Sequence, residues 1–267
     1  MLRDITLGQY FPGNSVFHRT DPRMKIVLTA LYIAAVFLAD SWWSYLVMVM
    51  GAVLIILFSR IPLRIVISGF KAVMLIIVFT AILNIFWTSG DNEPLWSFWK
   101  IRIYTEGLEH AGKMVLRLAC LLMGTNVLVS YTTSPIALTD GIERLFAPLK
   151  LIKLPVHEFA MMMTIALRFI PTLIEETDKI MNAQKARGAD FTEGNLVRRV
   201  KALIPILIPL FVSAFMRAGE LATAMECRCY NGGEGRTRMT VLKTRFTDWL
   251  MLIIFIAYGV GIVLIRN

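Results

Sequence analysis

Two arginines with small neighbours are the residues of this sequence best suited to a specific contact. Arg187 has an alanine and a glycine beside it, and Arg228, forty-one residues later, has a cysteine on each side. A planar guanidinium with five donors suits bidentate pairing with a carboxylate on a partner, and small neighbours leave it uncovered. The two motifs therefore predict two docking sites. They comprise Ala186, Arg187, Gly188, Cys227, Arg228 and Cys229.

A simpler interpretation of both arginines is structural. A positive side chain in the last turn of a helix interacts favourably with the helix dipole, by typically about 0.3 to 1 kcal/mol. The residue types alone leave both interpretations open.

The sequence predicts no catalytic, cofactor or metal site. His18, His110 and His157 are far apart and have no ligand spacing. The Cys-x-Cys pair has no histidine nearby, whereas a structural zinc site needs four donors. Cys120 falls within an apolar segment, so a disulfide framework is not expected either.

Three helices are expected between Thr133 and Arg245, where charges recur at helical spacing. The first begins after the Thr-Ser-Pro at 133–135, or at Thr139, and ends near Pro148. The second follows Pro155, runs to Arg187, and stops at a left-handed Gly188. The third begins after Asn195 and ends near Tyr230. The last two would each be about 50 Å long, with bends where they contain Pro171, Pro205 and Pro209.

The two long helices change character along their length. Their first halves, HEFAMMMTIALRFIPTLI and LIPILIPLFVSAFM, are apolar around most of the circumference, and their second halves are amphipathic. Such helices connect a membrane environment to a polar surface. Aligning the two ends places Ala183 over Ala224 and Arg187 over Arg228, which is a weak internal repeat.

The composition is that of an all-α integral membrane protein. Hydrophobic residues make up 57% of the chain and the mean hydropathy is +0.64, far above the soluble average. A bilayer-spanning helix needs roughly 20 apolar residues. About five spans are predicted, at Ile26–Ala39, Ser41–Ser59, Ala72–Gly90, Leu118–Thr139 and Trp249–Ile265.

Charge distribution predicts the orientation. Lysine and arginine accumulate on the cytoplasmic side of membrane proteins, and they are concentrated before the first span, between the second and third, and throughout 133–245. The N-terminus and segment 133–245 are therefore expected in the cytoplasm, and the C-terminus outside. The net charge of +9 is dispersed beside spans, which indicates topology and anionic lipid, not nucleic acid.

Three charges lie on one helix face at the entrance to a predicted span. Glu109, Lys113 and Arg117 are spaced by four residues, and a charge at the bilayer centre is costly. Glu109 and Lys113 are expected at the outer surface, with Arg117 directed inward to a partner. Asp21 is expected to cap the first span.

Several segments together resemble a known family over nearly the whole chain. They are HRTDPRMK (18–25), TTSP (132–135), LRFIPTLIEE (167–176), AQKARGADF (183–191) and RAGELATAMECRCYNGGEGRT (217–237). In order and spacing the sequence resembles the transmembrane T component of energy-coupling factor (ECF) transporters, the EcfT family.

The resemblance implies a function and a set of partners. The chain would couple ATP hydrolysis by two ATP-binding cassette ATPase subunits to a membrane-embedded substrate-binding S component, for uptake of a vitamin or another micronutrient across the plasma membrane. ATP and Mg²⁺ would bind the ATPases, and this chain would be non-catalytic. The Ala-Arg-Gly and Cys-Arg-Cys motifs would each dock on one ATPase, although cysteines flanking the second arginine depart from the commoner form.

The resemblance also implies a domain organisation. Residues 1–132 would hold four spans, 133–245 a cytoplasmic coupling domain with two long crossing helices, and 246–267 the last span. An interface with the S component is expected at the methionine run and nearby, at Met161, Met162, Met163, Arg168 and Pro171. Methionines form adaptable surfaces, but the sequence favours internal packing of this run over that role.

Three alternatives remain open. Within the family, the chain could serve a dedicated cobalt or nickel importer, although the double motif and the GGEGRT segment are more similar to the shared, vitamin-type module. An integral-membrane enzyme acting on lipid would need clustered acids or a nucleophile, and Glu175, Glu176 and Asp178 are the nearest candidates. A channel or carrier would need polar groups within its spans, where only Asn84 and Asn126 offer an amide.

Overall fold

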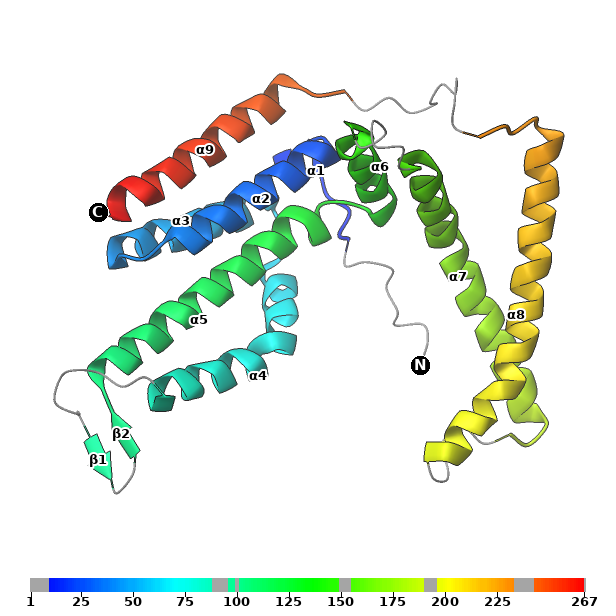
Figure 1. The fold of residues 1–267 in the computed structure, drawn as a ribbon, viewed down its shortest axis with the longest axis horizontal. Coiled ribbons are helices and arrows are strands. Elements are labelled where there is room, and N and C mark those ends of the chain that lie inside the picture. The colour runs from blue at the N-terminus through cyan, green and yellow to red at the C-terminus, as the bar shows by residue number, and fades with distance from the viewer. Residues whose placement is uncertain are drawn as a thin grey trace. The chain divides into compact units, whose positions relative to one another are not determined.

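The fold is all-α apart from one short hairpin. The structure, a computed structural model, describes residues 10–87, 96–98, 101–148, 155–189, 196–232 and 243–266. Its helices are α1 (Val16–Arg19), α2 (Pro22–Leu38), α3 (Trp42–Ser59), α4 (Leu63–Trp87), α5 (Thr105–Thr125), α6 (Pro135–Leu145), α7 (Val156–Ala186), α8 (Leu196–Cys227) and α9 (Phe246–Arg266) (Figure 1). A π-helical turn, η2 (Asn126–Tyr131), extends α5, and β1 (Trp96–Phe98) pairs antiparallel with β2 (Ile101–Ile103).

The described residues form two compact units. One comprises residues between Gly8 and Gly141 together with those between Leu242 and Asn267, and the other comprises residues between Ile142 and Val241. The boundary falls within α6. The first unit contains the helix bundle of α2, α3, α4, α5 and α9, and the second contains the long helices α7 and α8.

The predicted class of an all-α membrane protein is confirmed. Five helical segments are long and apolar enough to cross a bilayer: Trp42–Ser59, Thr105–Tyr131, Val156–Ala186, Val200–Cys227 and Phe246–Ile265. Helix α4 would add a sixth, bent by 58° between Leu63–Lys71 and Val73–Trp87. Ser68 and Gly69 lie just before this bend, and such pairs weaken a helix. Helix α2, which contains most of the predicted span Ile26–Ala39, has 17 residues and is one residue shorter than the shortest of these five segments.

The predicted span Leu118–Thr139 is wrong at both ends. The helix begins at Thr105 and its π-helical turn ends at Tyr131. It starts early because Glu109 and Lys113 pair with each other and Arg117 bonds the backbone of another helix end, so the charges do not interrupt it. It ends early because Pro135 begins α6.

The bundle packs around a tyrosine. Tyr32 of α2 is fully buried, stacks on Tyr258 of α9 with ring centroids 6.4 Å apart, and donates a hydrogen bond of 2.8 Å to the carbonyl of Cys120 in α5. Gly124 lies against the Tyr32 ring, where a Cβ would overlap it. Three helices thus meet at one side chain.

Helices α6, α7 and α8 lie where the sequence predicts three helices. Helix α6 takes the first of its two predicted starts, at Pro135. Helices α7 and α8 run continuously through Pro171, Pro205 and Pro209, and α8 visibly changes direction along its length (Figure 1). A proline removes a backbone hydrogen bond and crowds the preceding turn, which accounts for a bend without a break.

Candidate docking site at two helix ends

Helix α7 ends in a left-handed glycine turn. Ala186 is the last helical residue and Arg187 the capping residue, and Gly188 follows with φ of +86°. The amide of Gly188 donates to the carbonyl of Lys185 at 2.9 Å, and that of Ala189 to Gln184 at 3.0 Å. These two bonds define a Schellman motif, as the predicted stop at Gly188 requires.

Helix α8 ends in the same turn with a different residue. Cys229 stands where Gly188 stands in the first turn, with φ of +55°. Its amide donates to Glu226 at 2.8 Å, and the amide of Tyr230 donates to Met225 at 3.0 Å. The left-handed region disfavours a residue with a Cβ by roughly 1 to 2 kcal/mol. The backbone of the turn is therefore kept even though its sequence does not favour it.

The predicted docking residues are all at the surface. Ala186, Arg187, Gly188, Cys227, Arg228 and Cys229 are exposed, and the three cysteines of the chain are free. Each guanidinium extends from the residue just before a left-handed turn, so the two tips present the same group on the same backbone. This equivalence supports the internal repeat inferred from the sequence.

The two helices contact each other at a polar crossing. Glu176 of α7 accepts hydrogen bonds from Ser213 and from Arg217 of α8, the latter at 3.1 Å. Eleven residues separate Glu176 from Arg187, and eleven separate Arg217 from Arg228. At 1.5 Å per residue each arginine lies about 17 Å along its helix from the crossing.

The helices run in opposite directions through the crossing. Met161 and Ile165, near the start of α7, line a pocket of about 390 Å³ with Met225, Arg228 and Tyr230 at the end of α8. Arg187 and Arg228 therefore lie at opposite ends of the pair, as Figure 1 shows for the C-terminal ends of α7 and α8. A single compact partner could not easily cover both.

The residues expected at an S-component interface are distributed along α7. Met162 is 57% and Met163 40% exposed, and Arg168 and Pro171 are exposed as well. Met161 instead lines the pocket beside Arg228. The structure thus brings one of these residues to a predicted ATPase-docking tip, a proximity that the sequence did not predict.

A buried polar cluster in the bundle was missed by sequence reasoning. Lys25 is 2% exposed and donates hydrogen bonds to the carbonyl of Thr132 at 2.8 Å and to the hydroxyl of Thr133 at 3.0 Å. Asp21 and Asp248 are also buried and lie within electrostatic reach of Lys25. Lys25 lies just before the apolar segment Ile26–Ala39. Burial lowers the pKa of Lys25 to about 8, and the nearby carboxylates of Asp248 and Asp21 oppose that shift.

This cluster joins three distant segments. The segments HRTDPRMK and TTSP hold Asp21, Lys25, Thr132 and Thr133, and Asp248 lies in the first turn of α9. Asp21 caps α2 as predicted, since it accepts from the amide of Arg23 at 3.0 Å. The available signal was a lysine and an aspartate just before an apolar run, but a sequence does not show which distant groups they meet.

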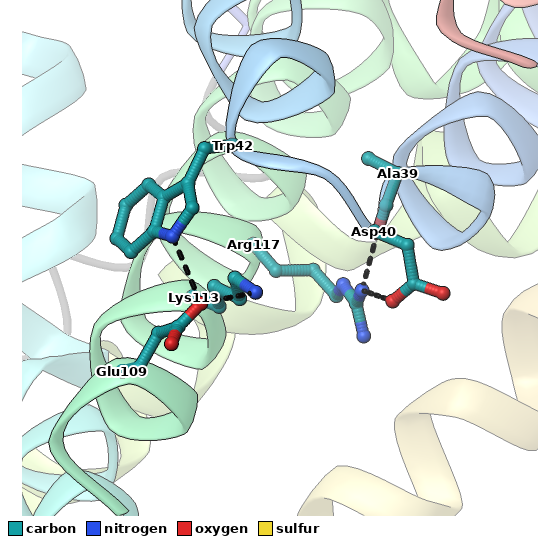
Figure 2. Close-up of polar contacts among 6 residues, drawn as sticks. All are labelled: Ala39, Asp40, Trp42, Glu109, Lys113 and Arg117. Carbon is teal, nitrogen blue, oxygen red and sulfur yellow. Dashed lines mark hydrogen bonds and ion pairs between the residues drawn. The ribbon is translucent and has the colours of Figure 1, made fainter. Parts of the chain in front are cut away.

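Figure 2 shows the second polar cluster, formed by the three charges of α5. Arg117 donates to the carbonyl of Ala39 at 2.6 Å and lies 4.0 Å from a carboxylate oxygen of Asp40. Glu109 pairs with Lys113 at 2.6 Å and accepts from the indole of Trp42 at 2.8 Å. Arg117 is directed inward as expected, and the partner it meets is the turn between α2 and α3 of its own chain.

No metal site is apparent in the part of the chain that the structure describes. Among those residues, no group of three or more His, Cys, Asp and Glu side chains could hold an ion. His157 pairs with Glu143 at 2.9 Å, and His18 bonds Ser15 and the carbonyl of Phe11. Both histidines thus have protein partners.

Comparison with known proteins decides the family. The family model described as CbiQ, cobalt transport protein, matches residues 13–239. A protein of Ruminiclostridium cellulolyticum named energy-coupling factor transporter transmembrane protein EcfT is 53% identical over 267 residues, which is all of this chain and 98% of that protein. The chain belongs to the EcfT family. Its membership of the EcfT proteins confirms the resemblance drawn from the sequence motifs.

Further EcfT proteins are similar over the same length. The one from Clostridium kluyveri is 52% identical over 94% of this chain and 92% of its own length. The one from Acidaminococcus fermentans is 50% identical over 100% of this chain and 98% of its own length. The chain is a transmembrane component of the ECF type, with several apolar helices and a multi-pass place in the membrane.

Proposed function

We propose that this chain is the scaffold that couples two ATP-hydrolysing subunits to a substrate-binding membrane subunit, each ATPase docking on one arginine tip. The observation that carries the proposal is the pair of exposed Schellman turns, with Arg187 and Arg228 at equivalent positions. Two equal contacts at opposite ends of an antiparallel pair fit two copies of one groove better than a single site.

The chemistry of the tips supports this assignment. An uncovered guanidinium can pair with a carboxylate through two parallel hydrogen bonds. Because the neighbours at 186, 188, 227 and 229 are small, a groove can enclose the arginine without displacing a large side chain. The orientation with the tips in the cytoplasm, where ATP is available, is part of the proposal.

The crossing would act as the pivot. ATP binding draws the two ATPases together, and each ATPase carries one tip about 17 Å from Glu176 and Arg217 along its helix. A movement of the tips then changes the angle at the crossing and moves the apolar first halves of α7 and α8. These halves would hold the S component, including at the exposed Met162 and Met163. Such coupling requires contacts that differ between the two states.

The proposal assigns no catalysis to this chain. ATP and Mg²⁺ would bind the ATPase subunits, and the substrate would be selected by the S component. The relatives are named as transporter transmembrane proteins, which supports a non-enzymatic role and disfavours a membrane enzyme acting on lipid. The description of the matching family model, cobalt transport protein, favours one second candidate, a dedicated cobalt or nickel importer.

ATP-driven uptake by the reconstituted complex tests the proposal. Arg187→Ala and Arg228→Ala should each weaken co-purification of the ATPases at least about tenfold, since a buried arginine contact is typically a binding hot spot. The double substitution should abolish uptake. Lys185→Ala is the matched control, because Lys185 is an exposed cation in the same last turn but not the capping residue.

The outcome separates docking from a helix-end role. All the substituted side chains are exposed, so the fold should persist, which circular dichroism of each variant would verify. Retention of both assembly and uptake in the double variant would reject the docking role. Assembly of one module with several S components would distinguish the shared transporter from a dedicated importer.

A further inference from the structure

We propose that a groove between α3 and α9 binds an anionic phospholipid, with an acyl chain in the groove and the phosphate at three arginines. The groove has a volume of about 390 Å³, within the range of ligand sites. Its floor includes the buried Phe17, Ile55 and Phe255, and its rim includes the exposed Leu54, Phe58 and Ile254. The lining is thus almost entirely apolar.

Helices α3 and α9 are antiparallel neighbours. The hydroxyl of Ser44 donates to the carbonyl of Ile262, and that of Tyr258 donates to the carbonyl of Met48. The end of α3 therefore lies beside the start of α9. Gly51 brings the two helices close, because a Cβ there would overlap the Tyr258 ring.

Three exposed arginines belong to elements whose ends meet there. Arg60 caps α3 two residues after Phe58, Arg245 immediately precedes α9, and Arg19 follows Phe17 by two residues. The start of α2 lies at this end as well, because Lys25 is within reach of both Asp21 and Asp248. In the described part of the chain, none of these three arginines forms an ion pair with a protein carboxylate.

Charge complementarity selects the occupant. An apolar groove with cations at one end matches a lipid with acyl chains and an anionic head group. Anionic lipids are enriched in the cytoplasmic leaflet of the membrane. The three arginines belong to the segments whose charge predicts that side of the membrane. A zwitterionic lipid would gain less at the arginines, and a protein helix would leave them without a partner.

Photolabelling of the full chain tests the site. The probe is phosphatidylglycerol with a photoactivatable diazirine in an acyl chain, added to the purified protein in phosphatidylcholine bilayers. Adducts should map to Leu54, Ile254 and their neighbours, and unlabelled phosphatidylglycerol should compete at least about tenfold better than phosphatidylcholine.

Two variants separate the head-group contact from the groove. Arg19→Gln, Arg60→Gln and Arg245→Gln combined should lower labelling at least about tenfold, since each surface cation contributes a factor of about five. Ile254→Trp should block the groove with all arginines intact. Arg64→Gln, an exposed arginine on α4, is the matched control and should label normally.

The proposal fails under any of three results. Equal competition by phosphatidylcholine would make the groove a general lipid contact. Labelling that survives both variants would place the lipid elsewhere. Protection of the groove by co-purified subunits, with no lipid adduct in the complex, would assign it to a protein partner. None of these results bears on ATPase docking, so the two proposals fail separately.

Discussion

Glu176 and Arg217 occupy equivalent positions in two helices and contact each other at 3.1 Å. Each lies eleven residues before the arginine that caps its own helix. The contact therefore lies at the centre of the approximate symmetry that relates α7 to α8. A crossing held at equivalent positions keeps the two arms equal, which suits a scaffold that must transmit the same movement to both ends.

A double-mutant cycle should detect coupling at the crossing. We expect Glu176→Gln and Arg217→Met to show a small non-additive interaction in thermal unfolding of the full chain, because the pair is partly exposed and solvent screens it. Glu175→Gln is the control, since Glu175 is exposed on the adjacent position. Strict additivity of the two substitutions would mean that the ion pair does not stabilise the crossing.

Replacing the left-handed residue should have opposite effects on the stability of the two turns. Gly188→Ala should destabilise the end of α7 by about 1 kcal/mol, because alanine disfavours positive φ. Cys229→Gly should stabilise the end of α8 by about 0.5 kcal/mol, since relief of strain exceeds the entropic cost of glycine. Amide hydrogen exchange of the last turns would measure both. Changes of the same sign would contradict the shared turn.

Lys25 should be required for a stable bundle. Lys25→Met removes the hydrogen bonds to Thr132 and Thr133 and leaves the buried Asp248 without the cation it faces, which should cost about 3 kcal/mol or more. Asp21 keeps its ion pair with Arg23. Lys71→Met, at an exposed lysine of α4, should change the unfolding free energy by less than about 0.5 kcal/mol. Similar melting temperatures for the two variants would show that the buried lysine is dispensable.

Two glycines of α5 should behave differently when changed to alanine. At Gly124 a Cβ would overlap Tyr32, whereas at Gly112 nothing lies within 4 Å. Gly124→Ala should destabilise by about 1 to 3 kcal/mol through overpacking, and Gly112→Ala should stabilise by about 0.5 to 1 kcal/mol through helix propensity. Thermal unfolding of both variants provides the measurement, and a stabilising Gly124→Ala would argue against the packing around Tyr32.

The helix ends were predictable because their signals are local. Gly188 as a left-handed stop, Pro155 before α7 and Pro135 at the start of α6 each act on neighbouring backbone. The span boundary at Leu118 was wrong for the opposite reason. Whether Arg117 ends or continues a helix depends on the carbonyl of Ala39, which is distant in sequence.

The amino-acid sequence by itself determined the membrane class, the long helices, their arginine ends and the family, because apolar runs, turn residues and motif spacing are properties of short segments. The tertiary structure alone decided that α7 and α8 run in opposite directions, that Glu176 meets Arg217, and that Lys25 lies beside Thr132. These contacts depend on how whole helices pack, since a buried charge selects its partner only after the segments around it are in place.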